Sequence, residues 1–160
     1  MFSSSGLEQS PSSELQHVTG VWQRMQGSSP IYDFLFSTIT LISATKGSIK
    51  AHLTLGPNHV NSRGTLHGAV TAAIVDWSGG LAIATHGLEK TGASVDIHVT
   101  YLATARVDEV IEIEATANKV GKSMAFTTIK VSKLVDGEVG AVVATASHTK
   151  FVQLVQQEKK

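Results

Sequence analysis

The residues of this chain best suited to chemistry lie in one segment, between Asn61 and Asp76. Asp76 is a carboxylate in the middle of an otherwise apolar stretch. An unpaired buried charge is costly, so such a residue usually has a partner or a chemical role. Two structural roles remain open, pairing with Arg63 and capping a neighbouring loop. The alternative is that Asp76 acts on a bound molecule.

Gly68 is the second residue of interest, because it falls where the same apolar stretch begins. If that stretch is a helix, its first turn carries unpaired backbone N–H groups and a partial positive charge. Glycine has no Cβ, so the carbonyl oxygen of another molecule can approach these groups closely. Such an arrangement can form an oxyanion hole from the backbone alone. Alternatively, Gly68 only permits close packing of the helix against a sheet.

The spacing of these two residues predicts how they would work together. Asp76 follows Gly68 by eight positions, which corresponds to about 12 Å along a helix. The two groups of one chain are therefore too far apart to serve the same bond easily. If two such helices lie antiparallel across a two-fold axis, Asp76 of one chain meets Gly68 of the other. We therefore expect a homodimer with a shared site.

The hydrophobic periodicity of the chain predicts the elements around this segment. Residues 1–13 are polar and rich in serine, which favours a flexible tail. A short helix is expected over residues 14–27, with Ser13 as its N-cap. A long apolar helix, enclosed on all sides, is expected over about residues 66–86. Strands are expected at 34–43, 48–55, 95–101, 110–118, 123–133 and 139–151, with turns at Lys46-Gly47 and Asp136-Gly137.

These elements add up to an α+β fold, in which an antiparallel sheet of five to six strands wraps around one long central helix. We assign this domain to residues 28–153 and expect a solvated C-terminal end over residues 154–160. The strand from residue 95 to 101 alternates apolar and polar side chains, which predicts that one of its faces is buried. Another α+β sandwich with the same number of elements would also fit the periodicity.

The composition excludes several classes of protein. Thirteen basic and thirteen acidic residues give no net charge, so the chain lacks the basic surface that nucleic acids require. The absence of cysteine excludes disulfides, thiolate metal sites and a cysteine nucleophile. Asp76, Trp77 and Ser78 interrupt the longest apolar stretch, which favours a buried helix over a membrane span. The seven histidines form no metal-binding motif, and we expect no metal ion.

The segment from Asn61 to Asp76 has the pattern N-x-x-G-T-L-H-G followed, after seven intervening residues, by D. Gly92-Ala-Ser-Val-Asp96 and Thr100-Tyr-Leu102 come after it. This combination resembles the PaaI-like hotdog-fold acyl-CoA thioesterases over residues 32–151, and it is closest to their eukaryotic branch. The resemblance implies the hotdog fold and the hydrolysis of fatty acyl-CoA by water, with no cofactor, because coenzyme A is part of the substrate. Ala69 departs mildly from the glycine often found at that position.

The resemblance also implies roles for individual residues. Asn61 and the Gly68 N–H would polarise the thioester carbonyl, and His67 would shape the loop beside it. Asp76 of the partner subunit would activate or orient the attacking water, which Ser94 would help to position. These five residues are the catalytic set that the resemblance implies.

A second set of residues is implied to contact coenzyme A, and it includes two lysines that flank a glycine. Lysine side chains are point charges suited to the CoA phosphates, although these two would also be ordinary for a hairpin. The set consists of Tyr101, Arg106, Lys119, Val120, Gly121, Lys122, Ser123, Met124 and His148.

Two other functions on the same fold stay open at this point. One is a non-catalytic module that binds acyl-CoA, and the other is a hotdog dehydratase or hydratase. A buried carboxylate at Asp76 favours the thioesterase, since a binding module has no chemical need for it. We expect an acyl group of medium to long chain and, by resemblance, a dimer of dimers. The first residues show no secretory signal, so we expect a cytoplasmic protein, with mitochondria as the alternative.

Overall fold

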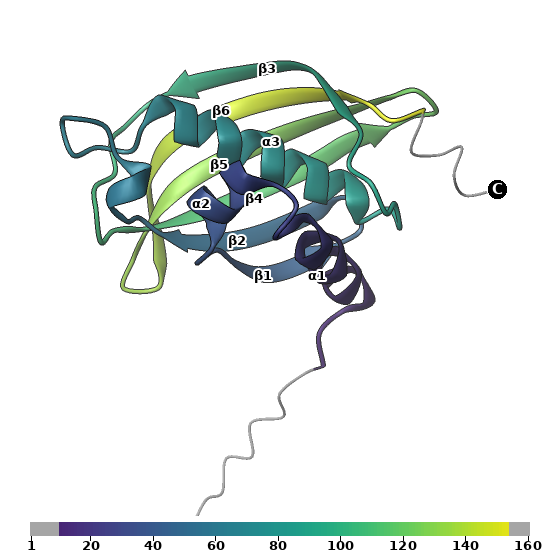
Figure 1. The fold of residues 1–160 in the computed structure, drawn as a ribbon, viewed down its shortest axis with the longest axis horizontal. Helices are drawn as coiled ribbons and strands as arrows, with labels where there is room; N and C mark the ends of the chain where they lie inside the picture. The colour runs from purple at the N-terminus through teal and green to yellow at the C-terminus, as the bar shows by residue number, and fades with distance from the viewer. Residues whose placement is uncertain (1–9, 154–160) are drawn as a thin grey trace, which may run out of the picture.

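Helix α3 (Gly68–Ala84) lies across one face of a six-stranded antiparallel sheet (Figure 1). The structure is a computed structural model that describes residues 10–153. Its strands are ordered β1-β2-β4-β5-β6-β3 across the sheet. This architecture confirms the predicted α+β hotdog fold. The strands are β1 (Thr40–Thr45), β2 (Ser48–Thr54), β3 (Ala93–Tyr101), β4 (Val110–Val120), β5 (Met124–Val135) and β6 (Glu138–Phe151).

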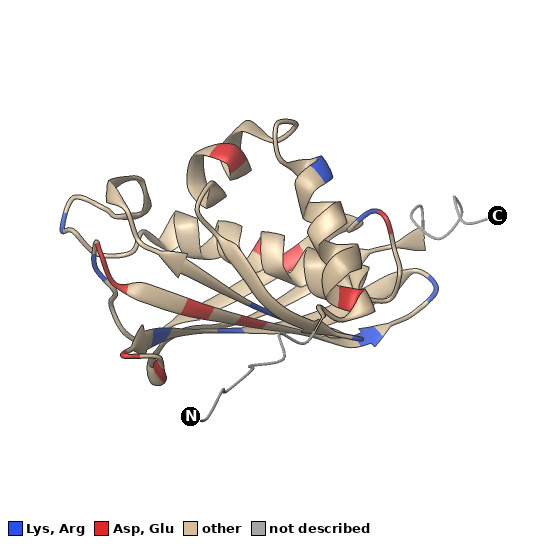
Figure 2. Ribbon diagram, turned by 90° about the horizontal axis from the view of Figure 1, so that it is seen from below, with Lys and Arg blue, Asp and Glu red and all other residues tan. Residues whose placement is uncertain are grey.

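Two shorter helices precede the sheet in the chain, α1 (Ser13–Met25) and α2 (Pro30–Phe36), and a single 3-10 turn, η1 (Pro57–His59), follows β2. Helices α1, α2 and α3 all lie on the same side of the sheet (Figure 2). Within residues 10–153, no helix is long and apolar enough to cross a membrane.

The core lies between α3 and the helix-covered face of the sheet. The C-terminal half of α3, from Trp77 onward, is buried throughout. The predicted enclosure on all sides is wrong for the N-terminal half, where Ala69 is exposed and Ala72 and Ala73 are only partly buried. Ile111 and Ile113 of β4 are fully buried on the sheet side. Trp77 meets Trp22 of α1 edge to face, with ring centroids 5.4 Å apart, and packs against Phe36 of α2 at 5.6 Å. Each such buried side chain contributes about 1.5–3 kcal/mol, and together they hold α3 in a fixed position.

Both predicted two-residue turns are present. Thr45 pairs with Ser48 across the β1–β2 turn, in which Gly47 has a φ of 86°. In the β5–β6 turn, Asp136 and Gly137 have φ values of 51° and 79°. Positive φ at both central residues is the hairpin turn that Asp-Gly favours. The β5–β6 turn sets the register of β6, and this register determines which residues of β6 face α3.

The segment around Phe34 differs from the prediction. The expected strand at 34–43 is wrong in its first part, because Phe34 ends up in α2 and the strand begins only at Thr40. Pro30 occupies the first turn of α2, where the fixed φ of proline favours a helix start. Both carboxylate oxygens of Asp33 accept the Gly27 N–H, at 2.9 and 3.0 Å. A short helix of mixed apolar residues is therefore selected by its local hydrogen bonds.

Helix α1 confirms the predicted amphipathic helix, with one change at its start. The N-cap is Ser12 and not Ser13, because the Ser12 hydroxyl accepts the Leu15 N–H at 3.1 Å. The same hydroxyl donates to the Ala44 carbonyl at 2.8 Å and so ties α1 to β1. The tail expected at residues 1–13 falls largely outside the described residues, as does the C-terminal end expected at 154–160.

Strand β3 forms one edge of the sheet and pairs only with β6. Its predicted half-burial is wrong for the single chain, since Val95, Ile97 and Tyr101 are 55%, 38% and 58% exposed. Only Val99 is partly covered. Val95, Ile97 and Tyr101 are therefore not buried by any other element of the described chain. A free edge strand with apolar side chains is a ready site for pairing with another chain.

Candidate active site

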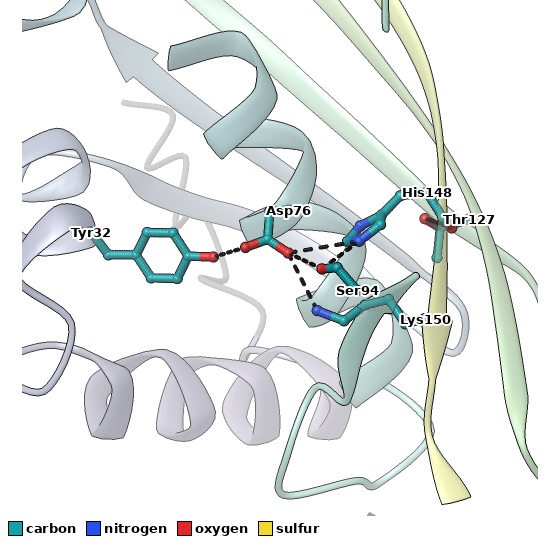
Figure 3. Close-up of polar contacts among 6 residues, drawn as sticks. All are labelled: Tyr32, Asp76, Ser94, Thr127, His148 and Lys150. Atoms are coloured by element: carbon teal, nitrogen blue, oxygen red, sulfur yellow. Dashed lines mark hydrogen bonds and ion pairs between the residues drawn. The ribbon is translucent and has the colours of Figure 1, made fainter. Parts of the chain in front are cut away.

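Asp76 lies near the middle of α3, and side chains from three other elements surround it (Figure 3). Tyr32 of α2 donates its hydroxyl to Oδ2 at 2.6 Å. Ser94 of β3 donates to Oδ1 at 2.9 Å, and the Lys150 ammonium of β6 lies 3.4 Å from the same oxygen. His148 Nε2 is 3.7 Å from it. The partners of Asp76 are thus these four residues and not Arg63, and the carboxylate is still about one-third exposed.

The strand register explains how β6 brings two of these side chains to the helix. Ser94 on β3 pairs with Lys150 on β6, and His148 is two residues earlier on β6. Alternate residues of a strand share a face, so both side chains point towards α3. Gly79 allows this approach, because a Cβ there would be 2.9 Å from His148 Nδ1. A larger residue at position 79 would push the imidazole away from the helix.

The surrounding groups keep Asp76 ionised. Burial raises its pKa, but hydrogen bonds from Tyr32 and Ser94 and the charge of Lys150 lower the pKa by more in sum. The pKa of Lys150 is lowered by burial, against the opposing influence of Asp76. Burial also lowers the pKa of His148, and the Lys150 charge adds to this effect. At neutral pH the site therefore contains an anionic Asp76 beside a neutral imidazole.

Ser94 connects the imidazole to the carboxylate. His148 Nε2 lies 2.9 Å from Ser94 Oγ, and that hydroxyl donates to Asp76. A hydroxyl has a single proton to donate. Because that proton goes to Asp76, Nε2 of His148 must carry the proton that binds Ser94. The two hydrogen bonds therefore run in one direction, from His148 to Ser94 and from Ser94 to Asp76, and the carboxylate is the final acceptor.

A second group of residues lies at the other end of α3. Asn61 Oδ1 accepts the backbone N–H groups of Arg63 and Thr65 at 2.9 and 3.3 Å, and the Thr65 hydroxyl at 3.2 Å. This leaves Asn61 Nδ2 as a donor with no acceptor among residues 10–153. The Gly68 N–H likewise has no acceptor within the described part of the chain. Two unpaired donors are what an oxyanion hole requires.

His67 and Tyr101 frame Gly68. His67 is the N-cap of α3, because its Nδ1 accepts the Ala69 N–H at 3.0 Å. The Tyr101 hydroxyl donates to the Gly68 carbonyl at 3.1 Å, and a Cβ on Gly68 would be 3.2 Å from it. Glycine therefore keeps the start of the helix open beneath this ring. The capping role of His67 is more specific than the loop-shaping role that the resemblance implies.

The residues implied to contact coenzyme A divide between the two ends of α3. Tyr101 lies at Gly68, and Arg106 bridges to Thr65 in the Asn61 loop. The hairpin between β4 and β5, residues 119–124, packs at the C-terminal end of α3, where Val120 contacts the cluster of Ile83. Its members are Lys119, Val120, Gly121, Lys122, Ser123 and Met124, and both lysines are exposed. His148 is buried at 1% exposure beside Ser94, so it supports Asp76 rather than offering a surface for a ligand.

The described chain therefore holds two separate groups of candidate site residues. Asn61, His67 and Gly68 form the donor half-site at the start of α3. Asp76, Ser94 and their partners form the carboxylate half-site about 12 Å further along the helix, at roughly 1.5 Å per residue. Within the part of the chain that the structure describes, no three His, Asp or Glu side chains gather as a metal site.

Comparisons with known proteins place the chain in a family. The sequence pattern of the thioesterase superfamily matches residues 63–151. Acyl-coenzyme A thioesterase 13 of Homo sapiens is 34% identical over 121 residues, which are 76% of this chain and 84% of the relative. The crystal structure of zebrafish thioesterase superfamily member 2 has a TM-score of 0.75 and 32% identity, covering 86% of this chain and 96% of that one.

The chain belongs to the thioesterase superfamily. A putative esterase of Schizosaccharomyces pombe is also similar, with 33% identity over 140 residues, 87% of this chain and 84% of the relative. Membership confirms the family expected from the motif and the class of enzyme, a thioester hydrolase. The matched residues include Gly68, Asp76 and Ser94, whereas Asn61 precedes them. Tyr32 on α2 lies outside the matched pattern.

Sequence reasoning missed two members of the carboxylate half-site, Tyr32 and Lys150. Tyr32 lies 44 positions from Asp76 and Lys150 lies 74 positions away. For Lys150 a signal was present, because it shares the inward face of an apolar strand with His148. Polar residues on such a face usually have a buried partner. For Tyr32 no local signal exists, since its contact depends on how α2 packs beside α3.

Proposed function

We propose that this thioesterase hydrolyses acyl-CoA by direct attack of water, at a site shared between two copies of the chain. The observation that carries the proposal is the separation of two unpaired donors at one end of α3 from an ionised, partly exposed carboxylate further along it. Neither half-site is complete alone. Two antiparallel α3 helices related by a two-fold axis would bring Gly68 of one chain to Asp76 of the partner subunit.

The free edge of β3 supports this assembly. Within residues 10–153 its backbone pairs with no strand on the outer side, and Val95, Ile97 and Tyr101 are exposed. Pairing of β3 with its own copy would be isologous, as a two-fold axis requires. It would cover Val95 and Ile97 and extend the sheet across the dimer. Since Ser94 is also on β3, the same pairing would place the carboxylate half-site next to the dimer axis.

The chemistry then follows from the two half-sites. The Gly68 N–H and Asn61 Nδ2 would bind the thioester oxygen and stabilise the oxyanion that forms when water attacks. Asp76 of the partner subunit, aligned by Ser94, would accept a proton from that water. The water oxygen bonds to the acyl carbon, and the carbon–sulfur bond then breaks. Coenzyme A leaves as a thiolate that takes up the proton, and the free acid is released.

The substrate class rests on the relatives and on the surfaces near each half-site. Acyl-coenzyme A thioesterase 13 is 34% identical to this chain. The exposed ammonium groups of Lys119 and Lys122 are suited to CoA phosphates. Ile31 and Phe34 of α2 are 59% and 63% exposed and provide apolar surface on the same helix as Tyr32. A fatty acyl chain of medium to long length fits this surface.

The experiment measures thiol release from a series of acyl-CoAs, from short to long chain and including an aromatic acyl group. Wild type is compared with Asp76→Asn, which keeps the side-chain volume and removes the charge. We expect turnover by wild type and a loss of at least about 100-fold in kcat for the variant. Binding of coenzyme A, measured by calorimetry, should be retained. Binding without thiol release by wild type would instead favour a non-catalytic acyl-CoA-binding module.

A further inference from the structure

Tyr32 donates to the oxygen of Asp76 that has no other hydrogen-bond or ion-pair partner among the described residues. Its hydroxyl donates to Oδ2 at 2.6 Å, whereas Ser94 and Lys150 both approach Oδ1. In Figure 3 the phenol lies on one side of the carboxylate, and the other polar groups lie on the opposite side. The two oxygens therefore have separate partners. Oδ1, which accepts the hydrogen bond from Ser94, is the oxygen suited to contact a water molecule.

The phenol is placed by packing inside the protein. Its ring lies 6.3 Å from that of Trp22 and 5.5 Å from that of Phe36, measured between centroids. Both of these rings also pack on Trp77, the residue that follows Asp76. The aromatic cluster therefore links the position of the hydroxyl to the helix that carries the carboxylate. Such a fixed donor restrains the carboxylate before any substrate binds.

We propose that Tyr32 is a positioning residue for Asp76, which fixes Oδ2 so that Oδ1 and Ser94 face the reacting water. The inference rests on the proposed function, because it assigns Tyr32 a part in the same hydrolysis. Tyr32 acts through Asp76 and supplies no atom to the substrate. Its loss should therefore affect the catalytic step more than the binding of acyl-CoA.

The hydrogen bond also stabilises the ionised form of Asp76. The groups that face the carboxylate are Tyr32 from α2, Ser94 from β3, and His148 and Lys150 from β6. Burial raises the pKa of Asp76, and the Tyr32 hydrogen bond is the largest influence that lowers this pKa. The pKa of Tyr32 is itself raised far above its ordinary range by burial and by Asp76. The phenol therefore remains a proton donor to the ionised carboxylate at neutral pH and well above it.

The first test compares wild type with Tyr32→Phe in thiol release across pH. Phenylalanine keeps the ring that packs on Trp22 and Phe36 and removes only the hydroxyl. We expect the acid limb of kcat/KM to move up by about one pH unit and kcat to fall about tenfold, the size of one lost hydrogen bond to a charged group. KM should change by less than about twofold, since binding is not the affected step.

Trp22→Phe is the matched control. It alters the packing of the same aromatic cluster but leaves the Tyr32 hydroxyl in place. We expect it to lower the stability of the protein and to leave the acid limb where it is in wild type. An equal movement of the acid limb in both variants would show that packing alone is responsible, and it would overturn the inference.

A second readout needs no turnover. The chain contains two tyrosines, Tyr32 and Tyr101, so the difference between wild type and Tyr32→Phe in phenolate absorbance reports Tyr32 alone. We expect this difference to develop only far above the ordinary tyrosine range, and to move to lower pH in Asp76→Asn. If the Tyr32 titration falls at the same pH in Asp76→Asn as in wild type, the contact between the two side chains is overturned.

The outcomes separate the two proposals. An active wild type whose acid limb and kcat are unchanged by Tyr32→Phe overturns the role of Tyr32 and leaves the proposed function intact. A folded wild type that releases no thiol from any acyl-CoA overturns the proposed function, and the positioning role falls with it.

Discussion

The backbone of Gly79 lies so close to the imidazole of His148 that a Cβ at position 79 would be 2.9 Å from Nδ1. Thr127 Oγ1 would be 3.0 Å away on the same side. Glycine inside a helix costs roughly 1 kcal/mol relative to alanine, so its presence in α3 has a reason. The reason is the approach of β6, which brings His148 to Ser94.

Gly79→Ala should therefore damage both stability and catalysis. The overpacking cost of about 1–3 kcal/mol exceeds the gain in helix propensity, and the displaced imidazole loses its contact with Ser94. We expect a lower urea midpoint and a kcat reduced about tenfold. Gly20→Ala in α1 is the control, because its Cβ would meet only Arg24 at 3.5 Å. That change should stabilise the protein by about 0.5–1 kcal/mol, and a stabilised Gly79→Ala would contradict the argument.

Ser94→Ala tests the link between the imidazole and the carboxylate. The hydroxyl lies 2.9 Å from both His148 Nε2 and Asp76 Oδ1, and its loss leaves two groups without their shared partner. We expect kcat to fall by about 10–100-fold with little change in KM, in line with the loss of an orienting group. Ser147→Ala, an exposed serine on β6, is the matched control and should keep wild-type kinetics. Equal kinetics for both variants would exclude Ser94 from the mechanism.

The sequence predicts those parts of this structure that depend on local patterns. The long apolar run identifies α3, and Asp136-Gly137 identifies a turn whose two residues both have positive φ. The strand predicted from residue 34 is wrong over residues 34–36, because a short run of mixed apolar character fits a strand and a helix equally well. There the decisive contacts are the Asp33 hydrogen bonds and the burial of Phe36, which only the folded chain supplies.

The candidate site shows the same division. The motif identifies Asn61, Gly68 and Asp76, since their order along the chain is itself the signal. The contacts of Asp76 with Tyr32 and Lys150 span 44 and 74 positions, so they depend on how α2 and β6 pack on α3. Such contacts leave no trace in local periodicity.

Glu112 predicts a pH effect on stability that is separate from catalysis. It alternates with Ile111 and Ile113 and so lies on the sheet face away from α3. Burial raises its pKa, but the hydrogen bonds from His52 and Lys50 lower the pKa by more in sum. A depressed pKa gives stability that is present above the ordinary value of 4.5 and lost as pH falls through the lowered value.

Glu112→Gln should therefore cost about 1–2 kcal/mol of unfolding free energy at pH 7. The difference from wild type should shrink steadily once the pH falls below the ordinary glutamate range. Urea unfolding at neutral and acid pH measures both values, and thiol release at pH 7 should be unchanged. Glu138→Gln, at an exposed position of β6, is the control and should show no difference at either pH. If Glu112→Gln lowers the free energy of unfolding by the same amount at neutral and acid pH, the variant has lost packing and not a charge interaction.

A mixture of two inactive variants provides the sharpest test of the shared site. Asn61→Asp keeps the oxygen that accepts the Arg63 and Thr65 N–H groups and removes the Nδ2 donor, so it disables the donor half-site. Asp76→Asn disables the carboxylate half-site. Each variant alone should be inactive, because every site of its homodimer lacks one group.

Co-expression of the two variants should restore activity only if the half-sites come from different chains. In a random mixture half of the dimers carry both variants, and one of the two sites in each is then intact, which predicts about a quarter of wild-type thiol release. Asp76→Asn mixed with Ser94→Ala is the control, since both changes fall in the carboxylate half-site and no mixed dimer has an intact carboxylate half-site. If each chain instead used its own Asp76 with its own Gly68, the first mixture would stay as inactive as the control, because every site would carry one defect.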